Sequence, residues 1–543
     1  MLQKAQLPNN IQELKKMISN LQAEYETKLQ EQEKKLNNER FKYLALEEKF
    51  LGLQRKFFGR KSEKLSDEEF GQMYLFNEAE QSSDSSEVEI KEEAEFISVK
   101  PHTRKKKRKE VFPSHLPEKE SIHEGDIEEK SCPCCGEDRP CIGEEITREI
   151  DIIPEQVRII KHVQKKYGPC ACEEFGNAEV PEVVTAKKPK RMLPGIIAGV
   201  GLLAYIFISK FLDSMPYYRQ EKRFKRLEII ISRTNMCNWQ IGATRKCQGL
   251  LELMWKETRS GPFMQMDETG LQVLKEPGRP AQSKGYMFVT IGYTQEHKPI
   301  VLYHYHQTRN KRIVADILEG FKGHLQTDGL GIYNDNNQSD GIIRVGCGAH
   351  IRRKFFEATL LAKGKIGIAH VALSYYAKIS KIEKELRADE NLSHDDFEQQ
   401  RRMQMGSILA DFHKYLKEKE PLVPPKTKLG EAISYALAEW ESWIRFLDKW
   451  YITPDNNFTE RMVKPFVIGR KNWMFSDTLR GAHSSATMYS LIQTAEVNGL
   501  NVYWYLRYLF TLLPYAETQD DLRALLPMYV TKEQLTEFMR GSL

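Results

Sequence analysis

No part of this 543-residue sequence has the uninterrupted apolar length of a transmembrane helix. The nearest candidate, residues 192–209, is uncharged but contains Pro194 and three glycines, so it predicts a buried helix. The N-terminus, MLQKAQLPNNIQELKK, lacks the apolar segment of a signal peptide. We therefore expect a protein of the reducing cytosol, with no membrane partner.

The net charge is small, only +5, but the charges are strongly segregated. Eleven acids and one base fall between Asp67 and Glu95, and six consecutive bases follow from Arg104 to Lys109. Such blocks are typical of a solvated, disordered segment whose basic run can bind an acidic partner. They predict a disordered acidic and basic linker over residues 66–111.

Cysteine is scarce outside one region. Six of the nine cysteines lie within about forty residues, and clustered thiols in a reducing compartment favour a metal over disulfides. Cys132 and Cys135 form a CxxC pair, and Cys170 and Cys172 form a tighter CxC pair beyond an alternating, hairpin-like stretch. The pattern predicts a zinc-ribbon-like module over residues 112–187, although Cys134 or Cys141 could substitute and unliganded structural thiols are the alternative.

Apolar residues near the N-terminus recur three and four apart, at Leu14, Ile18, Leu21 and Tyr25. This spacing is that of a heptad seam. It predicts a coiled coil over residues 1–65 that makes the chain a homo-oligomer. The alternative is a single amphipathic helix that packs on its own protein.

Three helical stretches follow each other over residues 188–258, the last of them opening at Ser232, a good N-cap. This order suggests a helix-turn-helix that binds DNA, and an ordinary helical bundle explains it equally well.

From Gly261 the pattern becomes that of strands. Three strands, a helix and a fourth strand are predicted, in the order that opens a ribonuclease H-like fold. Asp267 lies on the first of these strands and Asp328 directly follows the fourth. A third acid, Glu460, lies in the first turn of a predicted helix, with Arg461 and Lys464 on roughly the same side. Residues of about 365–450, which separate Asp328 from Glu460, are predicted to be a helical insertion.

Each acid alone has an ordinary explanation, as a turn residue, a cap or one member of a helical ion pair. Gathered together, three carboxylates repel each other unless cations lie between them. Two Mg²⁺ ions are the natural occupants, since they take oxygen ligands and can activate a water or a 3′-hydroxyl for attack on a phosphodiester.

Several longer sequence motifs, taken together, resemble those of one known protein family. DETG, LQTDG, CGAHIRRKFF and the run from Asn456 to Leu506 resemble the transposases of the insertion sequence 66 family of bacterial mobile elements. FGRKSEKL, CPCCG and KFLDSMPYYRQEKRF extend the resemblance over nearly the whole chain.

That resemblance implies that Asp267, Asp328 and Glu460 form a DDE triad that uses Mg²⁺ to cut transposon ends and to join the 3′-hydroxyl to target DNA. Cys347 and His350 match the family's CxxH element, for which packing, DNA contact and metal binding are competing roles. Basic residues beside these motifs are expected to contact phosphates, with a solvated basic helix face as the alternative; they are Arg352, Arg353, Lys354, Arg461, Lys464, Arg470 and Lys471. The family usually closes its zinc module with CxxC, so the CxC at Cys170 and Cys172 is a departure. Accessory proteins of the same element are further partners that the family suggests.

The sequence thus predicts a multidomain α+β protein. Its parts are a coiled coil, the linker, the zinc module, the helical region, a ribonuclease H-like α/β catalytic domain over residues 259–480 with its helical insertion, and C-terminal helices over 481–543. A catalytically silent DNA-binding protein and a nuclease of the same fold are the competing functions.

Overall fold

The computed structural model of the chain describes residues 11–58, 189–333, 341–360 and 367–542, with short pieces at 157, 159–162, 166–167 and 184–185. The chain divides into two compact units, Glu87–Pro189 and the remainder. In the smaller unit, strand β1 (Lys166–Tyr167) pairs antiparallel with β2 (Val184–Thr185). The predicted linker, the zinc-module cysteines and most of the predicted hairpin lie outside the described residues.

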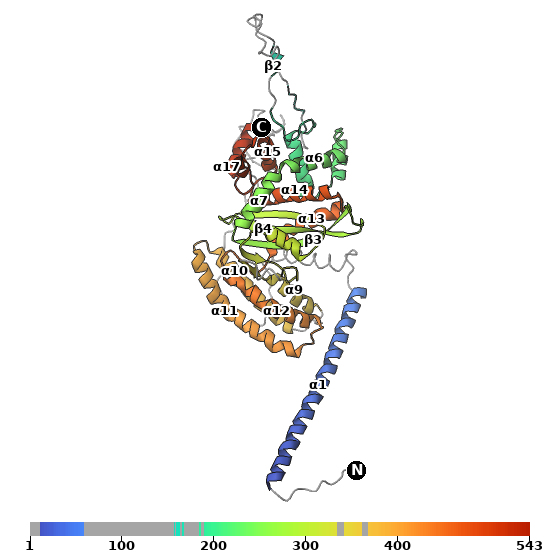
Figure 1. Cartoon of the computed structure of the whole chain (residues 1–543), viewed down its shortest axis with the longest axis vertical. Helices are drawn as coiled ribbons and strands as arrows, with labels where there is room; N and C mark the ends of the chain where they lie inside the picture. Colours follow the sequence, from blue (N-terminus) through green and yellow to red (C-terminus); the bar gives the residue numbers. More distant parts are fainter. Residues whose placement is uncertain are drawn as a thin grey trace, which may run out of the picture. The chain divides into compact units, whose positions relative to one another are not determined.

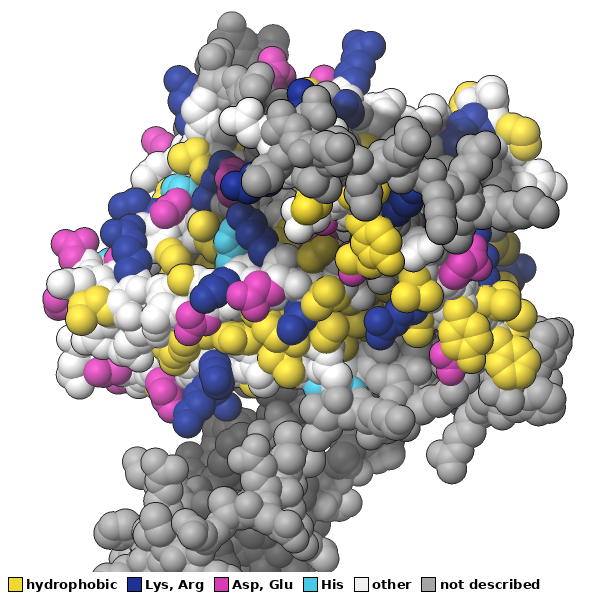
Figure 2. Space-filling model, turned by 90° about the horizontal axis from the view of Figure 1, so that it is seen from below, with side chains coloured by type: hydrophobic (Ala, Val, Ile, Leu, Met, Phe, Trp, Pro, Cys, Tyr) yellow, Lys and Arg dark blue, Asp and Glu magenta, His cyan; other side chains and the backbone are white. Residues whose placement is uncertain are grey.

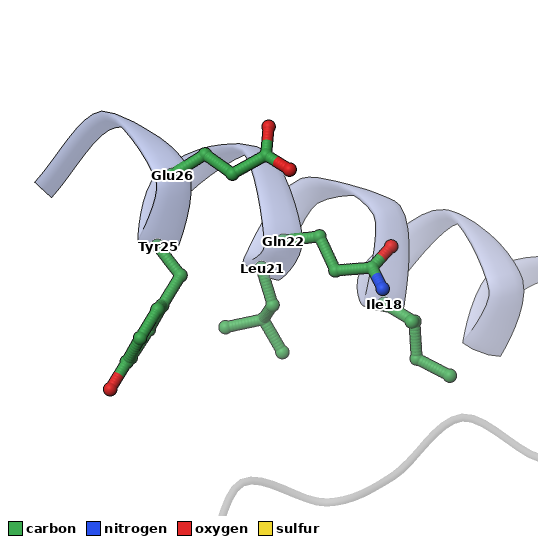
Figure 3. Close-up of a pocket in the computed structure, with 5 residues that line it drawn as sticks. All are labelled: Ile18, Leu21, Gln22, Tyr25 and Glu26. Atoms are coloured by element: carbon green, nitrogen blue, oxygen red, sulfur yellow. The ribbon is translucent and has the colours of Figure 1, made fainter. Parts of the chain in front are cut away.

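The N-terminal segment is one long helix, α1 (Ile11–Phe58). Ile18, Leu21 and Tyr25 extend from the same side of this helix (Figure 3), and they remain 53%, 54% and 75% exposed. At the other end of the helix, Glu48 accepts a hydrogen bond of 2.7 Å from the backbone N–H of Lys428. The apolar seam is therefore not covered by any described part of its own chain.

The predicted helices of the 188–258 region are present as α4 (Val200–Phe211), α5 (Tyr217–Arg226) and α6 (Arg233–Lys246), followed by α7 (Gln248–Ser260). Ser232 caps α6, since its hydroxyl accepts a hydrogen bond from the Asn235 N–H at 3.1 Å. The buried helix predicted over residues 192–209 is confirmed only from Val200 onward, where Phe207 and Phe211 are fully enclosed; residues 192–199 are not helical. None of the helices in the described ranges is both long and apolar enough to cross a membrane.

A mixed sheet forms the centre of the larger unit (Figure 1). Strands β3 (Phe263–Lys275), β4 (Lys284–Tyr293) and β5 (Pro299–His306) are antiparallel, and after helix α8 (Lys311–Leu318) the strands β6 (Gly323–Gln326) and β7 (Ile342–Val345) add in parallel. The strand order is β5-β4-β3-β6-β7, and the short β8 (Ser476–Thr478) pairs with the far end of β3. The predicted strands and the helix between them are thus confirmed, and β3 is the strand at which the direction of pairing changes.

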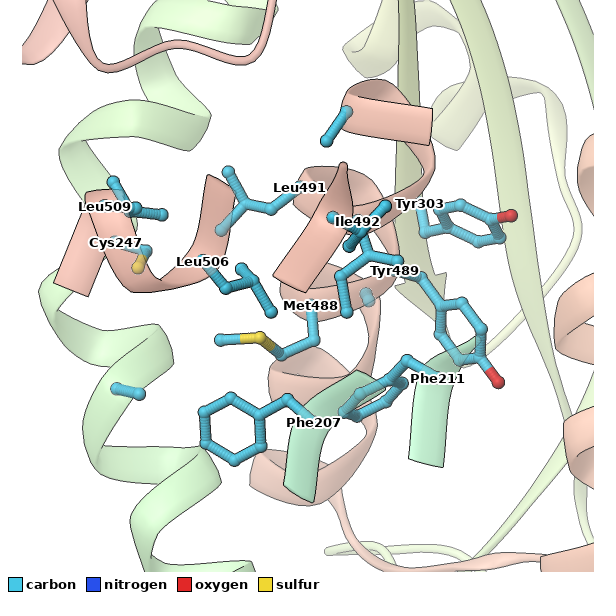
Figure 4. Close-up of a cluster of buried hydrophobic side chains, with 14 of the residues drawn as sticks. Phe207, Phe211, Cys247, Tyr303, Met488, Tyr489, Leu491, Ile492, Leu506 and Leu509 are labelled. Atoms are coloured by element: carbon cyan, nitrogen blue, oxygen red, sulfur yellow. The ribbon is translucent and has the colours of Figure 1, made fainter. Parts of the chain in front are cut away.

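Alternation along β3 divides its side chains between two layers. Met264 and Met266 pack with α8, whereas Leu271 and Val273 join the larger core formed with the C-terminal helices. Part of that core is drawn in Figure 4, where Tyr303 of β5 lies near Tyr489.

Two groups of helices complete the larger unit. Between β7 and the third acid lie α9 (Gly348–Thr359), α10 (Ile368–Ala388), α11 (His394–Lys419), η3 (Glu420–Leu422), α12 (Lys428–Ile444) and η4 (Arg445–Leu447), which share a separate core. After them come α13 (Asn457–Trp473), α14 (Leu479–Val497), α15 (Val502–Leu512), η5 (Leu513–Tyr515), α16 (Gln519–Ala524) and α17 (Lys532–Ser542). Helices are therefore observed where the sequence predicts an insertion.

Candidate active site

Asp267 lies in the middle of β3 and directly opposite Val289 of β4. The neighbouring Glu268 N–H donates a 2.8 Å hydrogen bond to Asp267 Oδ1, so the carboxylate is held close to its own strand. Burial raises the pKa of Asp267 well above its ordinary value, and the charges of Glu268, Asp328 and Glu460 raise it further. These acids therefore interact electrostatically, although they are far apart in sequence.

Asp328 follows β6, two residues beyond its last strand position. Its Oδ1 accepts a 3.2 Å hydrogen bond from the Leu330 N–H, which fixes the turn that carries it. Burial, and then the charge of Glu268, raise the pKa of Asp328 to about 7.

Glu460 lies in the first turn of α13 and is only 3% exposed. Neither of its carboxylate oxygens has a hydrogen-bond partner among the described residues. Burial raises its pKa to about 8, and the charge of Asp455 adds to the shift. A buried carboxylate with two unused oxygens is costly, and it fits a place where a cation or substrate group binds.

A network of buried amides, which the sequence does not reveal, ties the three acid-bearing elements together. Gln265 Nε2 on β3 donates a 2.6 Å hydrogen bond to Gln326 Oε1 on β6, and Gln265 Oε1 accepts one of 3.2 Å from Thr459 Oγ1 on α13. Both glutamines lie two residues before an acid, and Thr459 directly precedes Glu460. Because i and i+2 share one face of a strand, Gln265 lies on the same side of β3 as Asp267.

Glu268, on the opposite face of β3, has two close partners. Tyr333 Oη donates a 2.5 Å hydrogen bond to Glu268 Oε2, and Arg309 Nη1 lies 2.9 Å from Oε1. Tyr333 follows Asp328 by five residues, so this bond joins the stretch after the second acid to the strand of the first. The sequence singles out Asp267 and contains no signal for these contacts of Glu268.

Helix α12 of the inserted group supports the Asp328 turn through polar side chains. Tyr435 Oη accepts a 3.1 Å hydrogen bond from the Gly329 N–H. Arg344 Nη2 donates to the Asp328 carbonyl at 2.9 Å and to Glu439 Oε2 at 2.6 Å. The inserted helices are thus part of the structure that positions the second acid.

Metal binding at these acids is supported by their chemistry and not by a preformed ligand shell among the described residues. In the ranges that the structure describes, no three His, Cys, Asp or Glu side chains already form a common metal shell. The donor chemistry nevertheless suits a hard divalent cation, because mutually repelling carboxylates and two unpartnered oxygens of Glu460 are present. The residues therefore fit the ion, with remaining ligands left to water and substrate phosphate.

Cys347 and His350 lie at the start of α9, beside the first turn of α13. Cys347 Sγ donates to Asn456 Oδ1 at 2.8 Å, and the Asn456 N–H donates back to Sγ at 3.3 Å. Burial raises the pKa of Cys347 well above that of an ordinary thiol. His350 Nδ1 lies 3.9 Å from Glu460 Oε1. The structure therefore brings this pair to the third acid.

The basic residues singled out from the sequence have differing surroundings. Arg353 ion-pairs with Glu357 at 3.2 Å and lowers the pKa of nearby Glu460, while Arg470 donates to the Gly270 carbonyl of β3. Arg461 is exposed, unlike the buried Glu460, and their placement on roughly one side of α13 stays a prediction. The others range from half-buried to exposed: Arg352, Lys354, Lys464 and Lys471. On the face drawn in Figure 2, Lys and Arg side chains are interspersed with acidic and hydrophobic ones.

Comparison with known families places these features among the transposases. The profile described as "Transposase IS66 family" matches residues 195–484, more than half of the chain, and the chain belongs to that family. The "IS66 C-terminal element" matches 490–528, the "zinc-finger binding domain of transposase IS66" matches 129–173, and "Transposase C of IS166 homeodomain" matches 45–120. The resemblance noted from the motifs is therefore confirmed, and DNA is the partner that transposase domains imply.

Relatives from Sinorhizobium fredii (strain NBRC 101917 / NGR234) are similar over most of the chain. Uncharacterized protein y4qI is 29% identical over 427 residues, which cover 77% of this chain and 76% of the relative. Uncharacterized protein y4jD is also 29% identical, over 77% of this chain and 81% of the relative. Uncharacterized protein y4hP is 26% identical, over 75% of this chain and 74% of the relative.

Proposed function

We propose that this protein is a DDE transposase in which Asp267, Asp328 and Glu460 bind two Mg²⁺ ions and carry out DNA cleavage and strand transfer. The observation that carries the proposal is the convergence of three acids from separate elements, tied through Gln265, Gln326 and Thr459. The strand order β5-β4-β3-β6-β7, with three antiparallel strands followed by two parallel ones, supports a ribonuclease H-like catalytic domain.

The chain's own groups have distinct tasks in this scheme. Asp267, on β3, and Asp328, just after the neighbouring β6, would supply oxygens to the ions, and Glu460 would supply two more from the first turn of α13. Bound Mg²⁺ would activate the attacking water or 3′-hydroxyl and stabilise the leaving oxygen. Arg353 near Glu460 supplies positive charge for a phosphate, as do the exposed Arg461 and Lys471.

A strand-transfer assay tests this function. Purified protein is incubated with a DNA duplex that carries the element's terminal repeat, a supercoiled plasmid and Mg²⁺. Covalent joining of the repeat's 3′ end to the plasmid is the expected result. Cleavage without joining would identify a nuclease, and end binding without Mg²⁺-dependent nicking would identify a silent DNA-binding protein.

The zinc module remains a proposal on residues outside the described ranges. We assign Zn²⁺ to Cys132, Cys135, Cys170 and Cys172, because the zinc-finger profile matches 129–173 and includes all four. Two thiolate pairs supply the four ligands of a tetrahedral structural site. The basic set Arg352, Arg353, Lys354, Arg461, Lys464, Arg470 and Lys471 is likewise proposed to lie along bound DNA.

Metal binding should appear in the pH dependence of stability. Asp328 and Glu460 have pKa values of about 7 and 8 in the folded chain, above their ordinary values of 3.8 and 4.5. The folded state therefore binds protons more tightly than the unfolded state, and its stability falls as pH rises from about 4 to about 8. Mg²⁺ should raise the melting temperature more at pH 8 than at pH 6, since it replaces the lost protons. Calorimetry with and without EDTA measures this, and an equal Mg²⁺ effect at both values would contradict it. The Glu460→Gln variant should show a smaller difference.

The exposed seam of α1 should mediate self-association as a coiled coil. Deleting residues 1–50 is expected to halve the mass measured by light scattering. The double variant Ile18→Glu/Leu21→Glu should act in the same direction, because it places charges in the apolar seam. Gln22→Glu, on the same turn, is the control that should keep the mass unchanged. An unaltered mass after the deletion would refute this role.

A further inference from the structure

We propose that His350 binds, through Nδ1, the same divalent ion as Glu460, so that the candidate centre contains a nitrogen ligand beside its carboxylates. This inference rests on the proposed function, because it concerns the ion that Glu460 would hold. The remaining ligands would be water and a phosphate oxygen of DNA.

The first support is a set of polar atoms left without partners in one place. His350 Nδ1 and both oxygens of Glu460 are covered from solvent, and none has a hydrogen-bond partner among the described residues. Buried polar atoms in folded proteins are nearly always paired, so unpaired atoms that face one another indicate a missing ligand.

The second support is the distance between them. Nδ1 and Glu460 Oε1 are 3.9 Å apart, which is too far for a hydrogen bond. With bonds of about 2.1 Å, two ligands of one ion lie between about 3.0 Å apart when adjacent and about 4.2 Å apart when opposite. The observed separation is about 0.3 Å short of the opposite arrangement, so only a small shift of the two side chains would make both of them ligands.

The third support is the rigidity of the two helix starts that carry these ligands. The Gly348 N–H donates to the Pro454 carbonyl at 2.9 Å, and the same carbonyl accepts from Trp443 Nε1 at 2.9 Å. A Cβ at Gly348 would lie 2.5 Å from Trp443 Nε1, so only glycine permits this approach. Together with the paired hydrogen bonds between Cys347 and Asn456, these contacts fix the start of α9 against the start of α13. The Cys347 thiol therefore orients the His350–Glu460 pair and is not itself offered to the ion.

A mixed nitrogen and oxygen shell has a consequence for the choice of metal. Imidazole binds first-row transition metals much better than it binds Mg²⁺, whereas carboxylates accept both. The site should consequently bind Mn²⁺ more tightly than an all-oxygen site does, and this preference should depend on His350.

Pulsed electron paramagnetic resonance of the full-length protein with one equivalent of Mn²⁺ tests the assignment without any DNA reaction. The expected spectrum contains the ¹⁴N coupling of a bound imidazole. His350→Ala should abolish this coupling and weaken Mn²⁺ binding by roughly tenfold or more. His413→Gln is the matched control, since His413 stacks on Trp440 in the inserted helices and should leave the coupling intact.

The outcomes separate this inference from the proposed function. Two results would show that His350 is not a ligand while leaving the proposed carboxylate site unaffected. One is bound Mn²⁺ without ¹⁴N coupling in the wild type, and the other is coupling that persists in a folded His350→Ala variant. Failure of the wild type to bind Mn²⁺ at all, with or without DNA ends, removes both the centre and the histidine assignment.

Discussion

Replacing Asp267 by asparagine is expected to abolish DNA nicking while leaving binding to transposon ends intact. The substitution keeps the shape of the side chain and its hydrogen bond with the Glu268 N–H, but it removes the charge that the proposed ions require. Metal ions supply several kcal/mol of transition-state stabilisation in such reactions, which corresponds to a loss of roughly 10³-fold or more. Cleavage of labelled end DNA and a gel-shift assay on the same preparation measure the two properties.

Stability should change in the opposite direction from activity. Asp267 is one of several acids whose charges raise each other's pKa, so removing its charge relieves repulsion in the metal-free protein. The variant should therefore melt no lower than the wild type in EDTA, and it should gain less from Mg²⁺. Asp477→Asn is the control, because Asp477 is an exposed partner of Lys275 at the far end of β3. Equal loss of nicking and of end binding in Asp267→Asn would show that the residue serves the fold and not the metal.

Local sequence patterns are sufficient to predict many of the helices and strands, including β3, which carries Asp267. Alternating apolar residues predict β3, β4 and β5, and the capping residue Ser232 predicts the start of α6. Such signals depend on neighbours within a few residues, and these neighbours are present in the sequence whatever the tertiary fold.

Local sequence patterns do not predict the long-range contacts that align the acids. Gln265 pairs with Gln326 across 61 residues and with Thr459 across 194, and no periodicity links residues so far apart. The DETG motif singles out Asp267, but the partners of the neighbouring Glu268, which are Tyr333 and Arg309, follow only from the fold.

Removing Glu439 is expected to cost both stability and cleavage, although Glu439 is far in sequence from every acid of the site. Arg344, with a side chain only 3% exposed, donates to Glu439 at 2.6 Å and to the Asp328 carbonyl. Glu439→Ala leaves this guanidinium buried without its carboxylate, which typically costs about 3–5 kcal/mol. Denaturant unfolding measures the loss, and Glu441→Ala, at an exposed position of the same helix, should change the free energy of unfolding by less than about 0.5 kcal/mol.

A second variant distinguishes positioning from simple stabilisation. Arg344→Met/Glu439→Met removes both charges, and replacing a buried ion pair by apolar residues of similar size is often neutral or stabilising. Stability should therefore recover in the double variant. Cleavage should not, because a thioether side chain in place of the Arg344 guanidinium cannot donate to the Asp328 carbonyl, and the second acid loses its link to Glu439 of α12. Recovery of both properties would mean that the pair only holds the inserted helices on the sheet, whereas recovery of stability alone assigns the inserted helices a part in aligning the acids.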